Sequence, residues 1–497
     1  MAQRLIRRVL VPNRGEIAVR IARACREAGI ESVLAHSASD DVRFAQRFFD
    51  RAVSLGEGDA RATYLDVGKI IDAARRSGAD ALHPGYGFLS ERAELAAACE
   101  SGGITFIGPS AASVEAMGSK AEARHLMKRL GVPVVPGYDG EDQNDATLER
   151  EAERIGFPLL VKASAGGGGK GMKIVRQSSE LAAALESARR EAMKAFGNDR
   201  LLIERYLERP RHVEFQIFGD EEGHVVHLFE RDCSIQRRHQ KVIEESPAPT
   251  YSDDLRQRMG HAAVRAAEGV SYRNAGTVEF IVTADGQFYF LEMNTRLQVE
   301  HPVTELVLGV DLVRAQLDVA GGKPLPWSAG DLRQRGHAIE ARIYAEDPDD
   351  RFLPQSGTIE TWREPSGPGI RVDAGIAAGS VVQVNFDPML AKVIACGDSR
   401  EAAIARLVRA LGEMTLLGIR TNIAYLRRII LHPAFAAGEV STSFIPEHEG
   451  DLQRVIPDEA FAVAAVLSQV AAKPASPRAM NRAAVVTVWD RVGTWGR

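Results

Sequence analysis

Two glutamates in one predicted hairpin are the clearest sign of chemistry in this sequence. TVEFIVTA and QFYFLEMN alternate apolar and polar residues on either side of Asp285-Gly286, a combination typical of a β-hairpin with a two-residue turn. Such a turn places Glu279 opposite Glu292, with their Cβ atoms roughly 4.5–5.5 Å apart. Two carboxylate charges about 5 Å apart repel by roughly 3 kcal/mol at an effective dielectric constant of about 20. The pair therefore needs a compensating positive charge or free access to water.

A divalent cation would convert that repulsion into ligation. Mg²⁺ favours oxygen ligands and commonly takes one or two carboxylates together with substrate phosphates. Asn294 lies two residues beyond Glu292 and shares its face of the strand, so it is a third candidate ligand. The alternative is an exposed edge hairpin whose glutamates turn into water, although Phe, Ile, Tyr and Leu residues flank them.

The segment NTRLQVEHP, which follows the hairpin directly, supplies a second polar group. Arg296, Gln298 and Glu300 alternate with apolar residues, and Pro302 disfavours a helical conformation at His301. In an extended chain the three polar side chains project to one side. There a cation, an amide and a carboxylate can bind a small oxyanion and remove its proton. The alternative is a surface salt bridge between Arg296 and Glu300.

The segment SAGGGGKGMKIV contains four consecutive glycines at 166–169. Glycine exposes backbone N–H groups and tolerates any backbone conformation, which suits a phosphate cradle. Lys162, on the apolar strand just before the loop, favours this interpretation because a buried lysine needs an anionic partner. The sequence GK is not followed by Ser or Thr, so this is not a Walker A loop, and a flexible hairpin loop is the alternative.

Three further predicted strands carry polar residues on one face. They are Glu340 and Arg342 in HAIEARIY, His212, Glu214 and Gln216 in RHVEFQ, and Gln236, His239 and Lys241 in the basic cluster CSIQRRHQKVIEE. On local evidence Glu340 and Arg342 form a structural pair. A sheet that gathers these residues beside the glycine loop would form one site for an anionic ligand.

The elements that must position these residues change in kind along the chain. RRVLVPNRG, IESVLAHS and GGITFIGPS are predicted as buried strands separated by amphipathic helices, the pattern of a doubly wound α/β sheet. A small α/β unit around the glycine loop follows, and after residue 207 the pattern changes to hairpins. EAAIARLVRALGEM predicts an amphipathic helix, and KPASPRAMNRAA is typical of a linker. The predicted fold class is therefore α/β and α+β.

The composition is that of an ordinary globular protein. The 497 residues exceed one typical core, and 45% are hydrophobic and 26% charged. A net charge of -5 without a long basic run argues against a nucleic-acid partner. Four scattered cysteines without CxxC spacing indicate a reducing compartment and no zinc site. The apolar runs are too short for a signal peptide or a membrane span, so we expect a cytoplasmic protein with no membrane partner.

A lysine-tipped strand, a glycine loop and a Glu…Glu-x-Asn hairpin together resemble an ATP-grasp site. More narrowly, the chain resembles the biotin carboxylase family over about residues 4–448, through RGEIAVRIARACREAG, HPGYGFLSE, VKASAGGGGKGMK, RDCSIQRRHQKVIEESPAP, EMNTRLQVEHPVTE and EARIYAEDP. The resemblance implies an ATP-grasp fold. It places an N-terminal doubly wound α/β domain at 1–133, a small mobile lid at 134–206, a C-terminal sheet domain at 207–449 and a tail or linker at 450–497.

The resemblance also implies a role for each candidate residue. The implied ATP-binding residues are Lys120, Lys162, Gly167, Gly168, Gly169, Met172, Glu204, Leu207, His212, Gln236, His239 and Ile281, with Glu204 and Leu207 in the adenine-reading segment. The implied ligands of one or two Mg²⁺ or Mn²⁺ ions are Glu279, Glu292 and Asn294. The implied bicarbonate and biotin contacts are Lys241, Arg296, Gln298, Val299 and Arg342. Glu300 is the implied general base, Arg342 steadies the biotin enolate, and Lys241 and Arg296 complete the implied catalytic set.

The implied reaction is the ATP- and bicarbonate-dependent carboxylation of biotin, the first half-reaction of an acetyl-, propionyl- or other acyl-CoA carboxylase. Bicarbonate, deprotonated by Glu300, attacks the γ-phosphate of ATP to give carboxyphosphate, whose CO₂ is captured by the biotin enolate. The implied partners are a biotin carboxyl carrier protein or domain and a carboxyltransferase subunit, in a homodimer or a larger complex. Biotin would be a carried substrate not attached to this chain, because Lys194 in the tempting sequence EAMKA lies in a helical pattern rather than at a hairpin tip.

Two segments resemble one branch of that family. NFDPMLAK at 385–392 is more similar to the large biotin-containing subunits of propionyl- or methylcrotonyl-type carboxylases, and VWDRVGTWGR at 488–497 resembles the entry to their next region. The chain is either a fragment of such a subunit or works with a separate carrier, and the acyl-CoA acceptor is left open. The alternatives are another ATP-grasp ligase, joining a carboxylate to an amine, and a non-catalytic nucleotide-binding module. RLQVEHP and the Arg342 strand favour biotin carboxylase over the first alternative, and the intact Glu300, Glu279 and Glu292 favour it over the second.

Overall fold

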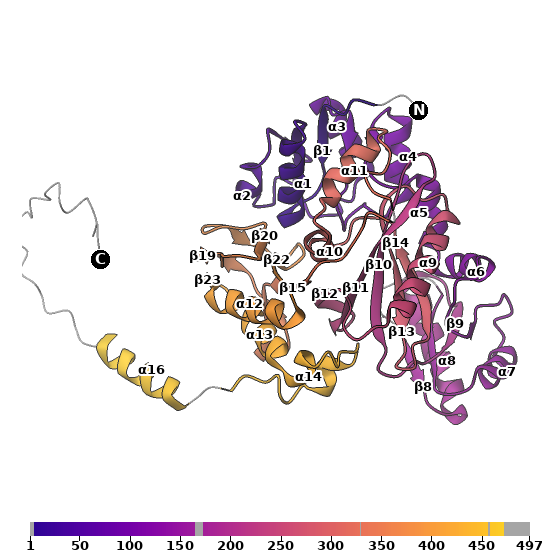
Figure 1. Cartoon of the computed structure of the whole chain (residues 1–497). Coiled ribbons are helices and arrows are strands. Elements are labelled where there is room, and N and C mark those ends of the chain that lie inside the picture. The colour runs from indigo at the N-terminus through magenta and orange to yellow at the C-terminus, as the bar shows by residue number, and fades with distance from the viewer. Residues whose placement is uncertain (1–3, 165–171, 329, 456–457, 472–497) are drawn as a thin grey trace, which may run out of the picture. The chain divides into compact units, whose positions relative to one another are not determined.

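The computed structural model describes residues 4–164, 172–328, 330–455 and 458–471 (Figure 1). Met1–Leu452 form one compact unit, and Gln453–Arg497 form a second unit that contains helix α16 (Asp458–Ala471). The glycines at 166–169 lie outside the described residues, so the role predicted for them stays a prediction. No helix in the described part of the chain combines the length and apolar character needed to cross a bilayer.

The N-terminal part is a five-stranded parallel sheet, as the alternation of buried strands and amphipathic helices predicts. In the order β3-β2-β1-β4-β5, its strands are Arg51–Ser54, Glu31–His36, Arg8–Val11, Ala81–Leu82 and Thr105–Phe106. Its helices are α1 (Gly15–Glu27), α2 (Arg43–Gln46), α3 (Val67–Ser77), α4 (Ala93–Ser101), α5 (Ala111–Gly118) and α6 (Lys120–Arg129). Gly29, just after α1, has a φ of 69°, the left-handed conformation in which a glycine commonly ends a helix.

A four-stranded antiparallel sheet contains the two strands that precede and follow the glycine segment in the sequence. In the order β6-β9-β7-β8, its strands are Gly137–Tyr138, Leu201–Arg205, Leu159–Ala163 and Lys173–Val175, with helices α7 (Asp145–Ile155) and α8 (Leu181–Phe196). The strands β7 and β8 that flank the loop pair with each other, as the strand–loop–strand pattern predicts. Lys194 lies on α8, so the helical interpretation of EAMKA is confirmed.

An eight-stranded antiparallel sheet dominates the rest of the compact unit. In the order β14-β13-β10-β11-β12-β15-β22-β20, its strands are Phe288–Asn294, Asn274–Val282, Arg211–Gly219, Val225–Arg237, Gln240–Ser246, His337–Tyr344, Met389–Gly397 and Ile370–Ala374. The accompanying helices are α9 (Asp253–Glu268), α10 (His301–Leu308), α11 (Leu312–Ala320), α12 (Arg400–Glu413), α13 (Ile423–Leu431), α14 (Pro433–Ala436) and α15 (Phe444–Glu447). Three two-stranded sheets add β16 (Glu346–Asp347) with β17 (Leu353–Pro354), β18 (Gly357–Thr358) with β21 (Val381–Val382), and β19 (Thr361–Arg363) with β23 (Thr415–Leu417).

The β13–β14 hairpin has the predicted register at its charged end but not the predicted turn. Thr283 and Gln287 bond across the tip, so the connection is the three residues 284–286, with Gly286 at a φ of 77°. This three-residue loop, an alternative to the two-residue type, shifts the pairing near the tip by one residue. A bulge at Leu291 takes up the extra residue, and Glu279 pairs directly with Glu292 beyond it.

The segment after the hairpin is not extended as far as the sequence predicts. Helix α10 begins at His301 and contains Pro302 in its first turn, so the expectation that Pro302 keeps His301 out of a helix is wrong. Proline lacks only an N–H that the first turn of a helix leaves unpaired, and its fixed φ suits that position. Residues 295–300 form the irregular connection between β14 and this helix.

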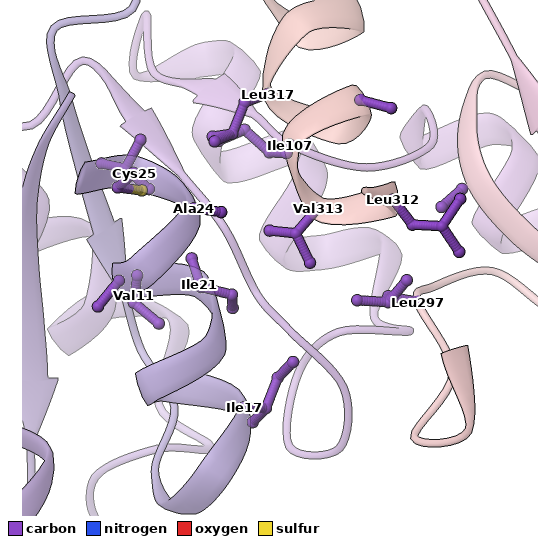
Figure 2. Packing of buried hydrophobic residues seen from close by; sticks show 14 of the residues in the cluster. Val11, Ile17, Ile21, Ala24, Cys25, Ile107, Leu297, Leu312, Val313 and Leu317 are labelled. Atoms are coloured by element: carbon purple, nitrogen blue, oxygen red, sulfur yellow. The ribbon is translucent and has the colours of Figure 1, made fainter. Parts of the chain in front are cut away.

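A shared hydrophobic core joins the N-terminal sheet to this connection. Ile17 and Ile21 of α1 face Leu312 and Val313 of α11, and all four belong to the core cluster that contains Leu297 (Figure 2). Leu297 is fully buried although both of its sequence neighbours carry polar side chains. The core therefore fixes the polar segment 296–300 through a single apolar residue.

Candidate active site

A row of charged residues crosses four neighbouring strands of the large sheet. Glu292, Glu279, Glu214 and Arg231 are paired in turn on β14, β13, β10 and β11. Only Glu292, at the outer end, is substantially exposed, with 40% of its side chain accessible. Arg231 is fully buried and donates from Nε to Glu214 Oε1 at 2.6 Å. Two like-charged pairs would repel along this row, so positive groups must approach it from other strands.

Lys241 on β12 supplies the central positive charge. Its Nζ donates to Glu214 Oε2 at 2.6 Å and to Glu279 Oε1 and Glu300 Oε1 at 2.8 Å each. Burial by itself would lower the pKa of Lys241, but these three carboxylates raise it well above its ordinary value. One protonated lysine therefore holds together three acids from separate segments. Glu214 of RHVEFQ and Lys241 of CSIQRRHQKVIEE thus come together, as the predicted gathering of these two strands requires.

Glu300 is fully buried between two cations. Lys241 bonds to one carboxylate oxygen, and Arg342 Nη2 donates to the other at 2.9 Å. Burial would raise the pKa of Glu300, but the charges of Lys241, Arg342 and Arg231 outweigh it and hold the pKa well below its ordinary value. Glu300 is thus an ionised carboxylate, available as a proton acceptor, whose basicity rises when either cation turns toward another anion.

Arg342 does not form the structural pair with Glu340 that the sequence suggested. Its guanidinium bonds to Glu300 and lies 2.5 Å from Glu244 Oε1, while both carboxylate oxygens of Glu340 lack a hydrogen-bond partner among the described residues. Burial raises the pKa of Glu244 to about 7, against the lowering effect of Arg342. Burial likewise raises the pKa of Glu340 well above its ordinary value. Arg342 therefore bridges the candidate base and a carboxyl group that holds its proton near neutral pH.

The predicted metal ligands are brought together on the hairpin. Glu279 accepts bonds at Oε1 from Asn294 at 2.8 Å and from Lys241, and at Oε2 from His212 at 2.7 Å. Burial opposes its charge, but Lys241 and His212 hold the pKa of Glu279 well below its ordinary value. The carboxylate of Glu292 lies 3.4 Å from Lys120. Two ionisable carboxylates and an amide, all with hard oxygen atoms, fit Mg²⁺ or Mn²⁺.

The residues of the predicted bicarbonate pocket already form hydrogen bonds with one another and with their neighbours. Arg296 donates from Nη1 to Gln298 Oε1 at 2.7 Å and lies 3.2 Å from Glu91, so it does not form the alternative salt bridge with Glu300. Gln298 in turn donates to Glu279 Oε1 at 3.3 Å. The backbone carbonyl of Val299 accepts from Lys392 Nζ at 2.8 Å. Lys241 therefore contacts the candidate base directly, whereas Arg296 is held by Gln298 and Glu91.

Four of the predicted ATP residues form two groups. His212 and Gln236 join the charged row, because Gln236 donates to His212 Nδ1 at 2.6 Å and His212 Nε2 donates to Glu279. Lys162 and Glu204 form an ion pair across β7 and β9, and Glu204 also accepts from Arg124 at 2.7 Å. The anionic partner that Lys162 was expected to need is therefore present in the protein itself.

The other predicted nucleotide contacts lie on separate segments. Lys120 opens α6, Met172 directly precedes β8, Leu207 follows β9, His239 is exposed in the β11–β12 turn, and Ile281 lies on β13 opposite His212. Gly167, Gly168 and Gly169 lie outside the described residues. The site residues on which sequence reasoning placed no role are Glu91, Arg231, Glu244 and Lys392. A buried charge in an otherwise apolar strand, as in MLAKVIACG, is the signal that could have found Lys392.

A hairpin that carries Glu279, Glu292 and Asn294, and a separate small sheet that carries Lys162, are the parts of an ATP-grasp fold. Three sequence profiles cover the chain in order. They are described as biotin carboxylase N-terminal domain (residues 5–114), carbamoyl-phosphate synthase L chain ATP-binding domain (119–328) and biotin carboxylase C-terminal domain (340–447). The chain belongs to the biotin carboxylase family.

Curated relatives share almost half of their residues with this chain. The biotin carboxylase of Halalkalibacterium halodurans is 48% identical over 444 residues, covering 89% of this chain and 98% of that protein. The methylcrotonoyl-CoA carboxylase subunit alpha of Dictyostelium discoideum is 49% identical over 464 residues, covering 93% of this chain but 66% of that protein. The chain therefore spans about two thirds of the length of the latter relative.

Solved structures agree with this placement. The biotin carboxylase domain dimer of Hydrogenobacter thermophilus 2-oxoglutarate carboxylase, in complex with MgADP, ADP and bicarbonate, matches with a TM-score of 0.86 at 44% identity, covering 91% of this chain and all of that chain. A Campylobacter jejuni biotin carboxylase in complex with β-γ-ATP matches with a TM-score of 0.86 at 40% identity, covering 89% of this chain and 99% of that chain. The predicted ATP-grasp fold is confirmed.

Proposed function

We propose that this chain carboxylates biotin on a carrier protein or domain, using ATP, bicarbonate and one or two Mg²⁺ or Mn²⁺ ions. The observation that carries the proposal is the position of Glu300, buried between Lys241 and Arg342 beside the Glu279–Glu292 pair. This arrangement provides one base, a cation bonded to each of its two carboxylate oxygens, and a separate set of oxygen ligands for a metal ion. The partners are a biotin carrier and a carboxyltransferase subunit, in a homodimer or larger acyl-CoA carboxylase complex.

The first step uses Lys241 and Arg296 to bind bicarbonate within reach of Glu300. Because Lys241 is shared among three carboxylates, an incoming anion competes with Glu300 for its ammonium group. Weaker contact with Lys241 raises the pKa of Glu300 and makes it a better base at the moment when bicarbonate is bound. The deprotonated bicarbonate attacks the γ-phosphate of ATP, the bond to the β,γ-bridging oxygen breaks, and carboxyphosphate and ADP form. Bound Mg²⁺, held by Glu279, Glu292 and Asn294, would supply positive charge for the phosphates.

The second step uses Arg342. Carboxyphosphate decomposes to CO₂ and phosphate, and the phosphate can accept the N1 proton of biotin. The enolate oxygen that forms is stabilised by the guanidinium of Arg342, which contacts the carboxylates of Glu244 and Glu300 and so is already oriented toward negative charge. The enolate nitrogen then forms a bond with CO₂. The segment 134–206 acts as a lid that keeps carboxyphosphate away from water.

The test is ATP hydrolysis measured with and without bicarbonate and free biotin. The proposal requires phosphate release that depends on bicarbonate and increases with biotin, together with carboxybiotin in the product mixture. Phosphate release that instead depends on an amine and a carboxylic acid would support the alternative, an ATP-grasp carboxylate–amine ligase. A nucleotide-binding module without catalytic activity would release no phosphate under either condition.

A further inference from the structure

Lys392 is the most completely buried lysine among the described residues, and the proposed reaction assigns it no role. It lies in the middle of β22, between Arg342 on β15 and Asp373 on β20, with which it is directly paired. Its side chain is fully inaccessible to solvent. An ammonium group is moved to such a position only at a large cost in hydration, which must be recovered from specific partners.

The partners of Lys392 are unequal. Its Nζ lies 3.2 Å from Glu16 Oε1 and 3.8 Å from Asp373 Oδ2, and it donates a 2.8 Å hydrogen bond to the backbone carbonyl of Val299. Asp373 has a stronger partner in Arg371, at 2.8 Å. Glu16 also accepts a hydrogen bond from Tyr86, and burial raises the pKa of Glu16 to about 7. The shortest contact of the ammonium group is therefore with a neutral backbone oxygen.

Val299 is the residue before the proposed base, and side chains hold the backbone around it: His301 Nδ1 lies 2.8 Å from the carbonyl of Gln298, and Arg296 donates to that of Leu297 at 3.1 Å. Residues 295–300 lie between β14 and α10 and belong to no strand or helix. The local backbone bonds are long: His301 donates to the carbonyl of Gln298 at 3.4 Å, and Val303 donates to that of Glu300 at 3.3 Å. Leu297 anchors one side of the segment in the shared core (Figure 2). The bond from Lys392 anchors the other side.

We propose that Lys392 is a positioning residue that fixes the backbone of Val299 and Glu300, so that the base meets its substrate in the correct geometry. Two directly paired cations would then have complementary roles, because Arg342 holds the side chain of Glu300 and Lys392 holds the main chain beside it. The inference rests on the proposed function, because Val299 and Glu300 matter to catalysis only as bicarbonate contact and base.

The decisive variant is Lys392→Met, which keeps the length of the side chain and removes the donor. A misplacement of about 1 Å at a reacting group costs up to about 100-fold in rate, so we expect kcat for bicarbonate-dependent ATP cleavage to fall roughly 10–100-fold and the bicarbonate KM to rise. The KM for MgATP should not change, since no nucleotide contact is assigned to this strand. Glu16→Gln is the matched control: it removes the ion pair but leaves the bond to Val299, and should retain wild-type kinetics.

Hydrogen exchange provides a readout that does not depend on any reaction. In Lys392→Met without substrates, peptides covering residues 297–303 should exchange faster than in wild type, while peptides covering β10 should not change. Lys392→Met leaves Glu16 without its cation. If that variant does not fold, the double variant Glu16→Gln/Lys392→Met, which also removes the charge of Glu16, is used in its place. Failure of both variants to fold would assign Lys392 to structure alone and overturn the proposal.

The other outcomes are equally definite. Unchanged bicarbonate kinetics and exchange in a folded Lys392→Met protein overturn the proposal. Equal losses in Glu16→Gln and Lys392→Met also overturn it, because charge balance and not the bond to Val299 would then matter. A wild-type protein without bicarbonate-dependent ATP cleavage removes the proposed function instead, and the exchange of residues 297–303 then decides the positioning role by itself.

Discussion

Glu279 and Glu292 are directly paired across β13 and β14, yet their carboxylates are neutralised by different lysines. Lys241 bonds to the buried Glu279 at 2.8 Å, and Lys120 lies 3.4 Å from the half-exposed Glu292. The repulsion expected of this pair is therefore relieved by two side-chain cations from separate elements. Both lysines are also proposed substrate contacts, so a bound metal ion would release them to meet phosphate or bicarbonate.

Glu292→Gln should weaken metal–nucleotide binding without disturbing the fold. A lost carboxylate ligand should lower metal affinity by at least the roughly 10–100-fold that loss of a supporting residue costs. The free energy of unfolding should change by no more than about 0.5 kcal/mol, because the side chain is half exposed. Glu447→Gln, which removes a surface partner of Arg209, is the control. Normal ATP hydrolysis by Glu292→Gln at limiting Mg²⁺ would show that the metal assignment is wrong.

Glu300→Ala and Arg342→Ala should separate the two halves of the reaction. Glu300→Ala should abolish bicarbonate-dependent ATP cleavage and biotin carboxylation together. Arg342 bonds to Glu300, so Arg342→Ala should impair ATP cleavage as well, but carboxybiotin formation should fall further by roughly 10²–10³. Phosphate release and carboxybiotin are measured in parallel. An equal loss in both assays would mean that Arg342 acts only through Glu300.

The predicted phosphate cradle is tested by hydrogen exchange of the segment 164–172. Gly167 and Gly168 should exchange more slowly when MgATP is bound, because their N–H groups would then donate to phosphate oxygens. The comparison is between free protein, MgATP and Mg²⁺ alone. Exchange that is the same with saturating nucleotide as without it would contradict the cradle.

Two buried histidines should make the protein less stable in acid. Burial lowers the pKa of His83 to about 3, and burial together with Lys392 and Arg20 lowers the pKa of His301 well below its ordinary range. Below a pH of about 6.5 the unfolded chain binds protons at these residues and the folded chain does not, so stability rises with pH and is lost as pH falls. Each histidine accounts for about 1.4 kcal/mol per pH unit in this window.

His83→Gln should therefore reduce the acid sensitivity of the fold, whatever its effect at neutral pH. The difference in the free energy of unfolding between about pH 7.5 and about pH 5.5 should shrink by about 1.4 kcal/mol. Urea titrations of wild type and variant at both pH values provide the measurement. A difference equal to that of wild type would show that His83 is protonated in the folded protein.

The sequence predicted the elements well and which polar residues share a strand face, but it could not predict which groups neutralise one another. The two-residue turn from which the pairing of Glu279 with Glu292 was predicted is wrong, and the pairing holds because the bulge at Leu291 restores the register. Arg342 was assigned to Glu340, two positions away on its strand. Its actual partners come from β12 and the connection after β14, and strand order across a sheet cannot be read from local periodicity.

Neither the start of helix α10 nor a role for Lys392 was predicted from the sequence. Pro302 was treated as a barrier, whereas a proline in the first turn is tolerated and the helix begins one residue earlier. Lys392 lies in an apolar strand, and its partners are distant in sequence: Glu16 lies near the start of the chain, and Val299 lies 93 residues before Lys392. Such long-range partners are determined by tertiary packing and leave no local pattern.

The burial of Leu297 in a core that it shares with α1 bears on how this protein can be divided. A fragment that starts after residue 133 would retain every residue to which the sequence assigned a role except Lys120. It would nevertheless lack Ile17 and Ile21, which belong to the same core as Leu297 of the segment 296–300. Such a truncated gene product should be catalytically inactive, and residues 1–133 supplied as a separate polypeptide should restore its activity.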